Sequence, residues 1–407
     1  MINTGSGTIG SPLIWIQSGA AAEMSGMDLS AYPDTDNGVF FRVGGTTSDA
    51  YQTGGTLRLS GNNRLYDFEG DFEIRGEFLI SGGTTSFDGA EIDLHYGGIT
   101  VESGTLEMKN RTVIRVVDDL GSGPLFTVKN GGVLKLMSGT DLDLSGLGNE
   151  TAVKVESGGT LIIDRALVSQ ANGSNPEAFI ILDGGELQII NNAVVQFNQN
   201  TSTSGNIIRM TGGKLTVDGS RISNNTVSAS EAAGCGGVIC TKGTDIVITN
   251  SQLKDNTGNN VGVLSAENSA VFQVSNNVIS GNKASYSAAV FYAAETAVTI
   301  GDGNQITNNR TENYGGFLRV VDGSVAVGDN NIFQNNQRID RGGVICAESS
   351  PVVIGNDNTF SENRTGRESG GAVYLKDGDF TLGNNNTFYK IFPLQEAELL
   401  VYQTRIT

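Results

Sequence analysis

The stretch ITNNRTENYGGFLRVVDGSVAVGDNNIFQNNQRIDRGGVI, residues 306–345, contains each feature that repeats in this chain. An apolar residue stands three positions before an asparagine at Ile306 and again, 27 residues later, at Phe333. Two glycines followed by apolar residues occur at 315–318 and, at the same distance, at 342–345. Between these motifs the segment 325–327 alternates and ends at a glycine. The repeat therefore holds three short strand-like segments separated by turns.

The same motifs extend through most of the chain. The apolar-x-x-Asn signature is also found at Phe197-Asn200, Ile222-Asn225, Leu253-Asn256, Ile279-Asn282 and Phe360-Asn363. In the first half, glycines precede an alternating strand at 54–57, 104–106, 131–134, 158–161, 184–187 and 212–215. One such coil cannot bury its apolar face, but coils stacked about 4.8 Å apart build a continuous core.

The repeat thus predicts an all-β fold, a right-handed parallel β-helix. Right-handed winding is expected for parallel crossovers. We predict a three-sheet solenoid over residues 1–388, with about 27 residues per coil and about 14 coils. Residues 389–407, where the pattern breaks, are expected to be a C-terminal cap or a ragged end. Each repeated asparagine should lie at a turn, where left-handed backbone geometry costs it little and where stacked amides form a ladder.

Composition restricts the partners. A net charge of −18 lacks the basic footprint that nucleic-acid binding needs. No apolar run is long enough to predict a transmembrane segment. Of the three cysteines, Cys240 and Cys346 occupy equivalent strands about 19 Å apart, too far for a disulfide. Cys235 and Cys240 are also too far apart if their segment is extended, so we expect buried thiols.

The alternation of F/I-x-x-N with G-G-A/V/F-I/L/V over residues 197–373 resembles the repeat of the chlamydial polymorphic outer-membrane proteins and related adhesin-like surface proteins. That resemblance implies an exported, surface-exposed passenger that binds a protein or glycan of a host or neighbouring cell. The chain shows neither the family's secretion signal nor its translocating barrel, so we expect a segment of a larger extracellular or outer-membrane protein. The resemblance gives no information on oligomeric state.

Catalysis is the alternative, because polysaccharide lyases and hydrolases also use this fold, as do trimeric glycan-binding phage tailspikes. Catalysis would require carboxylates stacked in one column with a base. The acids at 34 and 36, 118 and 119, and 141 and 143 do not align with an arginine or lysine one coil away, and His95 lies in an alternating strand. Calcium could bind the turn at 355–358, but no calcium-binding array repeats. We therefore predict no enzyme, no cofactor and no metal.

A binding surface is better supported, at the corner that follows each repeated asparagine. This corner varies in length, from 310–314 in one coil to 226–235 in another. Insertions in a solenoid map to loops that often bind partners, and arginine and tyrosine are enriched at contact hot spots. The candidate ligand-binding residues are Lys283, Tyr286, Arg310, Tyr314, Arg338, Arg341, Arg364 and Arg367.

Overall fold

The computed structural model describes residues 12–30, 39–46, 48–49, 51–66, 69–117, 123–230, 235–337, 341–366, 370–393 and 400–403. All regular elements in these ranges are β-strands, and all of their ladders are parallel. The strands form a β-solenoid of about 13 turns that repeat about every 27 residues, which matches the right-handed parallel β-helix that the sequence predicts. The predicted fold class is therefore confirmed.

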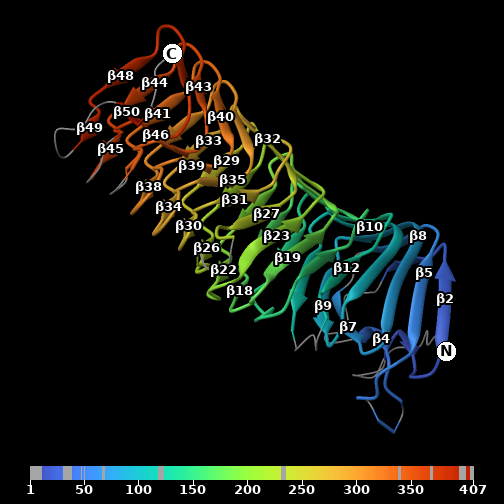
Figure 1. Cartoon of the computed structure of the whole chain (residues 1–407). Helices are drawn as coiled ribbons and strands as arrows, with labels where there is room; N and C mark the ends of the chain where they lie inside the picture. Colours follow the sequence, from blue (N-terminus) through green and yellow to red (C-terminus); the bar gives the residue numbers. More distant parts are fainter. Residues whose placement is uncertain are drawn as a thin grey trace. The chain divides into compact units, whose positions relative to one another are not determined.

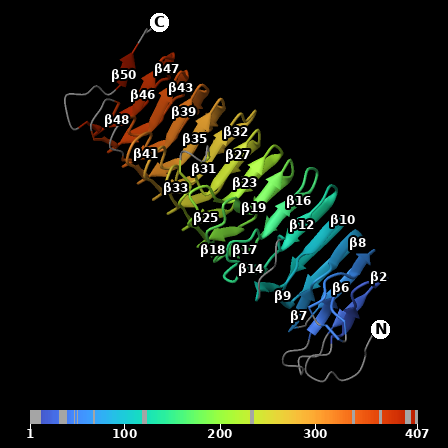
Figure 2. The same cartoon turned by 60° about the horizontal axis from the view of Figure 1, so that its bottom comes forward.

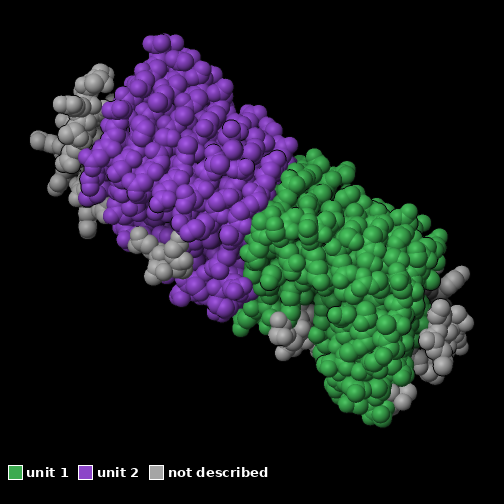
Figure 3. Space-filling view, turned by 45° about the vertical axis from the view of Figure 1, so that its right-hand side comes forward, with its two compact units in different colours: residues 1–173, 179–194 green, residues 174–178, 195–407 purple. Residues whose placement is uncertain are grey.

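The chain divides into two compact units, and each is described by itself. Unit 1 comprises residues 1–173 and 179–194, and unit 2 comprises residues 174–178 and 195–407 (Figure 3). In both units each coil passes through three faces, here called face 1, face 2 and face 3 in chain order, and equivalent strands lie side by side (Figure 1 and Figure 2).

In unit 1, face 3 consists of β1 (Ile14–Ile16), β4 (Val39–Val43), β7 (Glu69–Ile74), β9 (Glu91–His95), β11 (Val113–Val116), β14 (Asp141–Asp143) and β17 (Leu167–Ser169). Face 1 contains β2 (Ala21–Ser25), β5 (Thr56–Ser60), β12 (Phe126–Val128), β15 (Val153–Val155) and β19 (Ala178–Asp183). Face 2 contains β3 (Asp28–Ser30), β6 (Asn63–Tyr66), β13 (Gly132–Leu136), β16 (Thr160–Asp164) and β20 (Glu186–Ile190). The long strands β8 (Glu77–Asp88) and β10 (Ile99–Lys109) run through faces 1 and 2, and β18 is Asn172–Gly173.

In unit 2, face 1 consists of β23 (Asn206–Thr211), β27 (Ile239–Lys242), β31 (Leu264–Glu267), β35 (Phe291–Ala294), β39 (Leu318–Val321), β42 (Ile345–Glu348), β46 (Val373–Lys376) and β50 (Leu400–Gln403). Face 2 consists of β24 (Lys214–Asp218), β28 (Asp245–Thr249), β32 (Phe272–Ser275), β36 (Ala297–Ile300), β40 (Ser324–Val327), β43 (Val352–Ile354) and β47 (Phe380–Leu382). Face 3 consists of β25 (Arg221–Ser223), β29 (Gln252–Lys254), β33 (Val278–Ser280), β37 (Gln305–Thr307), β41 (Ile332–Gln334), β44 (Thr359–Ser361) and β48 (Thr387–Tyr389), and β21 is Val194–Gln196.

A fourth, two-residue strand, which the sequence did not predict, forms at the corner after face 3. Among the described residues, unit 1 contains one such strand, β18, and the others belong to unit 2. These corner strands are β22 (Gln199–Asn200), β26 (Thr226–Val227), β30 (Thr257–Gly258), β34 (Lys283–Ala284), β38 (Arg310–Thr311), β45 (Arg364–Thr365) and β49 (Phe392–Pro393). In the tail, where a cap or ragged end is expected, β49 pairs with β45 and β50 pairs with β46.

The predicted asparagine ladder is present and buried. Each side-chain amide donates to the amide oxygen of the asparagine one coil further on, as from Asn309 Nδ2 to Asn336 Oδ1 at 3.0 Å. The ladder comprises Asn198, Asn225, Asn256, Asn282, Asn309, Asn336 and Asn363. A second ladder at another corner, which the sequence analysis missed, joins Asn277, Asn304, Asn331 and Asn358.

Two details of the predicted repeat are wrong. Left-handed geometry belongs to the residue before each ladder asparagine, such as Asn308 with φ of 59°, and not to the ladder asparagine itself. The motif at Phe197 and Asn200 is also displaced, because Asn198 is the residue that joins the ladder. Phe197 has φ of 56° and is 58% exposed, so it is a turn residue rather than a core residue.

The paired glycines serve two different needs. Gly342 has a φ of 64°, a backbone angle that residues with a side chain rarely adopt. A Cβ on Gly343 would lie 2.0 Å from the carbonyl oxygen of Gly371 in the next coil. The first glycine therefore permits the turn, and the second permits the coils to approach each other.

Candidate functional site

The corner strands of unit 2 stack three cations and one glutamine in a single line. Lys283 pairs in register with Arg310, and isolated bridges join Arg310 to Gln337 and Gln337 to Arg364. Neighbouring members are thus one coil apart, about 4.8 Å along the sheet. We call Lys283, Arg310, Gln337 and Arg364 the basic row. The register therefore places these four residues at equivalent positions on successive coils.

Local sequence explains why the cations of the basic row point outward. Arg310 follows the buried ladder residue Asn309 and precedes Thr311, which is also buried. Lys283 likewise stands between buried Asn282 and Ala284. Since both neighbours of each cation are directed inward, the intervening side chain is exposed to solvent.

A tyrosine pair lies a few residues further along the same corner. The rings of Tyr286 and Tyr314 are 6.3 Å apart between centroids and meet edge to face, at 74° between planes. Tyr286 is 38% exposed. An isolated bridge places Arg341 in register with Tyr314. Two further candidates, Arg338 and Arg367, lie outside the described residues.

Face 1 brings another arginine, Arg319 of β39, to Tyr314. Its guanidinium carbon lies 4.0 Å from the Tyr314 ring centroid and 5.7 Å from that of Tyr292. Nη2 donates to Glu348 Oε2 at 3.1 Å, and Nη1 donates to Ser287 Oγ at 3.3 Å. The Arg319 side chain is only 14% exposed. These contacts hold the guanidinium against the Tyr314 ring.

The charge of Arg319 is matched locally. Burial acts to lower the pKa of the guanidinium, but the charge and hydrogen bond of Glu348 outweigh burial and leave the pKa above its ordinary value. Arg341 makes a similar contact with Tyr374, at 5.4 Å from the ring centroid. We call Tyr286, Tyr292, Tyr314, Arg319, Arg341 and Tyr374 the aromatic–arginine cluster.

Sequence reasoning missed the face 1 half of this cluster, although a signal was present. Tyr292, Arg319, Cys346 and Tyr374 occupy one register position on β35, β39, β42 and β46. Each directly follows the four-residue motif of paired small residues and two apolar residues. That next position points away from the core, because strand residues alternate.

A second set of ionisable side chains lies on face 3 of unit 1, and it contradicts the sequence analysis. Asp71, Asp93, Arg115 and Asp143 are in register on β7, β9, β11 and β14. The prediction that no acid aligns with a basic residue one coil away is therefore wrong for Asp143. The acids at 34, 36, 118 and 119 lie outside the described residues. The alignment was missed because coil lengths in this region depart from 27 residues.

This acidic column is partly neutralised. Arg115 bonds Glu91 at 2.9 Å and Asp93 at 3.4 Å. Burial raises the pKa of Asp71, as do the charges of Asp93 and Glu73, against the opposing effect of His95. Burial and the charge of Asp143 likewise raise the pKa of Asp141.

His95 is a strand residue, as predicted. It ends β9, and its Nε2 lies 3.7 Å from Asp71 Oδ2.

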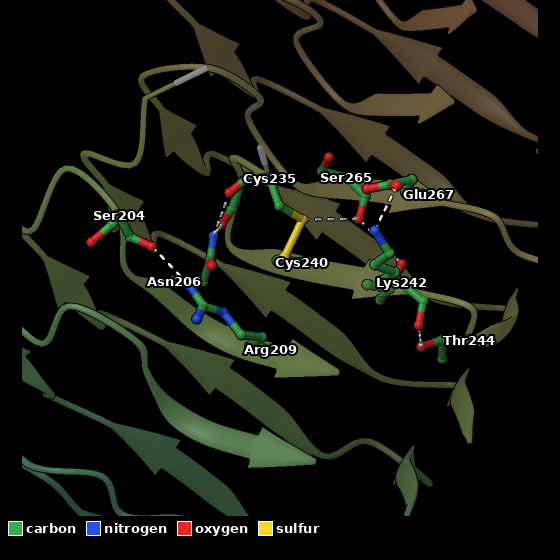
Figure 4. Close-up of a disulfide and its surroundings, with 11 residues drawn as sticks. Ser204, Asn206, Arg209, Cys235, Cys240, Lys242, Thr244, Ser265 and Glu267 are labelled. Carbon is green, nitrogen blue, oxygen red and sulfur yellow. Dashed lines mark hydrogen bonds and ion pairs between the residues drawn. A yellow bond between two sulfur atoms is a disulfide. The ribbon is translucent and has the colours of Figure 1, made fainter. Parts of the chain in front are cut away.

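The cysteine prediction is wrong for one pair. Cys235 and Cys240 form a disulfide, with Cα atoms 5.7 Å apart (Figure 4). The prediction assumed an extended segment, but β27 begins only at Ile239, and Gly237 has φ of 124° and turns the chain back. Cys235 Sγ also lies 3.9 Å from the carbonyl oxygen of Ser265 on the next coil. Cys346 is buried.

The described residues were also searched for a metal site and for a membrane-spanning helix, and the chain was compared with known proteins. No group of three or more histidine, cysteine, aspartate or glutamate side chains within the described ranges is arranged to hold a metal ion. In the same ranges there is no helix long and apolar enough to cross a membrane. The architecture defines the class of the molecule, a parallel β-helix. No family model, curated protein or solved structure matches the chain.

Proposed function

We propose that this chain is an adhesin-like, non-catalytic binding segment of an exported surface protein, and that the basic row contacts an acidic partner on a host or neighbouring cell. The observation that carries the proposal is the register of Lys283, Arg310 and Arg364 in a chain with a net charge of −18. Two unit charges 4.8 Å apart in water repel by about 0.9 kcal/mol. An acidic partner would relieve this repulsion between Lys283 and Arg310, which lie on adjacent coils.

The disulfide supports export. Disulfides form and persist in oxidising compartments and are rare in reducing ones. The Cys235–Cys240 bond joins two residues five positions apart, in the same unit as the basic row. An extracellular location would keep this bond intact.

The test is a triple charge reversal, Lys283→Glu, Arg310→Glu and Arg364→Glu. The matched control reverses Lys214, Arg221 and Lys254, which lie on faces 2 and 3 of the same unit and change the net charge equally. We expect binding to host or neighbouring cells to fall at least tenfold for the first variant only, and wild-type binding to weaken as salt rises. Equal binding of both variants, with unchanged thermal melts, would refute the proposal.

The acidic column favours a second candidate function, hydrolysis or elimination on a polysaccharide. Asp71 and Asp93 lie on adjacent strands, and a carboxyl group whose pKa is raised can act as a general acid. The test is turnover of pectin or chondroitin by the wild type and by Asp71→Asn. Turnover that this substitution abolishes would establish catalysis. A wild type without turnover would remove the candidate.

A further inference from the structure

The basic row and the aromatic–arginine cluster share the same four coils of unit 2. The row runs through Lys283, Arg310, Gln337 and Arg364, and the cluster begins only three or four residues after the first two of these. Tyr314 and Arg341 occupy equivalent positions on adjacent coils. Cations and aromatic rings therefore repeat side by side with the coil spacing, about 4.8 Å.

Tyr314 is fixed before any partner binds. One face of its ring is covered by the Arg319 guanidinium at 4.0 Å, and its ring and the Tyr286 ring meet edge to face at a centroid distance of 6.3 Å. Glu348 and Ser287 hold Arg319 in turn. A ligand that packs on this tyrosine pair would not have to order it, and preorganisation of this kind improves affinity.

We propose that the basic row and the aromatic–arginine cluster together form a site for an anionic polysaccharide, with the cations binding its carboxylate or sulfate groups and the tyrosine pair packing on its sugar rings. This inference rests on the proposed binding function and names its ligand class. Arginine and lysine suit carboxylate and sulfate groups, and aromatic side chains combine an apolar body with a polar tip.

The periodicity separates a polysaccharide from an acidic protein. The basic row places one polar side chain on each of four successive coils, in the order lysine, arginine, glutamine and arginine. A polymer with regularly repeated anionic groups can meet such a line at several points. The acidic patch of a folded protein has no corresponding period.

Arg319 is a positioning residue in this scheme. Its charge is engaged by Glu348, and its role is to hold the Tyr314 ring. Arg319→Lys keeps a cation beside Glu348 but removes the planar group that covers the ring. The expected effect is weaker binding of a glycan with the same salt dependence, since the number of cations at the row is unchanged.

The experiment uses the full chain and four probes: chondroitin sulfate, polygalacturonate, neutral dextran and polyglutamate. We expect binding to one or both anionic glycans and none to dextran. Chondroitin sulfate carries both carboxylate and sulfate groups, whereas polygalacturonate carries carboxylates alone, so binding of polygalacturonate would show that carboxylates suffice. Tyr286→Ala should weaken glycan binding about thirtyfold, the effect that marks a contact hot spot. The matched control, Tyr389→Ala, removes a tyrosine that is 56% exposed on β48 and should leave binding unchanged.

The outcomes separate this inference from the proposed function. If polyglutamate binds as tightly as the glycans and Tyr286→Ala has no effect, the partner is an acidic protein. The glycan inference then fails while the basic row stands. If no anionic probe binds, the glycan inference is also overturned, and the cell-binding assay decides the proposed function by itself. Retained glycan binding by the triple charge reversal would overturn the glycan inference alone, and the cell-binding assay would again decide the proposed function.

Discussion

Removing one amide from the buried asparagine ladder is the sharpest test of what stabilises unit 2. In Asn309→Ala the methyl group replaces a side chain that is fully buried. Nδ2 of Asn309 donates to the Ile279 carbonyl at 3.0 Å and to Asn336 Oδ1 at 3.0 Å. Oδ1 accepts from the backbone N–H of Asn282 at 3.1 Å and from its Nδ2 at 3.0 Å. The substitution deletes all four bonds.

The magnitude follows from which groups lose their partner. Asn282 Nδ2 keeps its bond to Leu253, and Asn336 Oδ1 keeps its bond from the Asn309 backbone. The backbone N–H of Asn282 and the carbonyl of Ile279 lose the amide that bonds them. A buried hydrogen bond contributes about 1 kcal/mol, and a buried group left unsatisfied costs about 1–3 kcal/mol. We expect local stability to fall by about 4 kcal/mol.

The matched control is the preceding residue. Asn308 is exposed, and its Oδ1 accepts one surface bond from Asn335 Nδ2 at 2.6 Å. Its positive φ means that Asn308→Ala should cost about 1 kcal/mol. Both variants remove an asparagine amide from the same turn, so the difference between them isolates the ladder.

Hydrogen exchange read by mass spectrometry is the appropriate assay, because a repeat protein opens locally. The single tryptophan, Trp15, lies in unit 1 and does not report on this coil. A loss of 4 kcal/mol corresponds to about a thousandfold loss of protection, expected in peptides that cover residues 282–336. If Asn309→Ala reduces protection by no more than Asn308→Ala does, the ladder adds nothing beyond a turn amide and our reasoning is wrong.

Three further predictions concern other parts of the chain. Phe197 is exposed and has left-handed backbone geometry, and the equivalent position 308 carries asparagine. Phe197→Asn should therefore raise the free energy of unfolding by about 0.5–1 kcal/mol. A lower free energy of unfolding in urea titration would contradict the strain argument. Reduction of the Cys235–Cys240 disulfide should destabilise the protein by about 2 kcal/mol. Cys235→Ser should abolish this response to reductant, and labelling of Cys240 in the oxidised native protein would contradict the bond. Burial and neighbouring carboxylates raise the pKa of Asp71 in the folded state. Ionisation of Asp71 therefore lowers the stability of the folded protein. This loss of stability disappears as the pH falls through the raised pKa. Asp71→Asn should therefore be more stable than the wild type at pH 7, by about 0.5 kcal/mol, and equal to it near pH 3; a difference independent of pH would exclude the charge explanation.

The inward half of the repeat was predictable because packing makes it strict. Ile306, Phe333 and Phe360 are fully buried on successive strands of face 3, and Phe333 and Phe360 stack at 4.6 Å between centroids. A residue at such a position must be apolar in each coil, so the period is visible in the sequence. The basic row was predictable for a related reason, since each cation directly follows a ladder asparagine.

The missed features depend on coil length and on turns. Asp93 and Asp143 align with Arg115 only after spacings of 22 and 28 residues, which a fixed period of 27 residues cannot reproduce. The second ladder was missed because its asparagines stand among other polar residues, as at 328–331. The disulfide depended on one backbone turn at Gly237. For the column of charges and the disulfide, the decisive quantity is a local change of backbone path, which the pattern of residue types does not encode.

The outward positions are free to differ between coils because the core and the ladders already determine the fold. Face 3 illustrates this freedom. In unit 1 one register position of face 3 carries Asp71, Asp93, Arg115 and Asp143. The outward residues of face 3 in unit 2 are uncharged on three strands: Gln305 and Thr307 on β37, Ile332 and Gln334 on β41, and Thr359 and Ser361 on β44. A charge concentrated on one face therefore does not follow from the repeat. The same reasoning applies to the corner of unit 2, where Thr257 precedes Lys283 in the same register column and the cations begin only there. Because the fold accepts threonine and glutamine in this column, the repeat does not require the cations at Lys283, Arg310 and Arg364, and the anionic ligand that we propose would account for them.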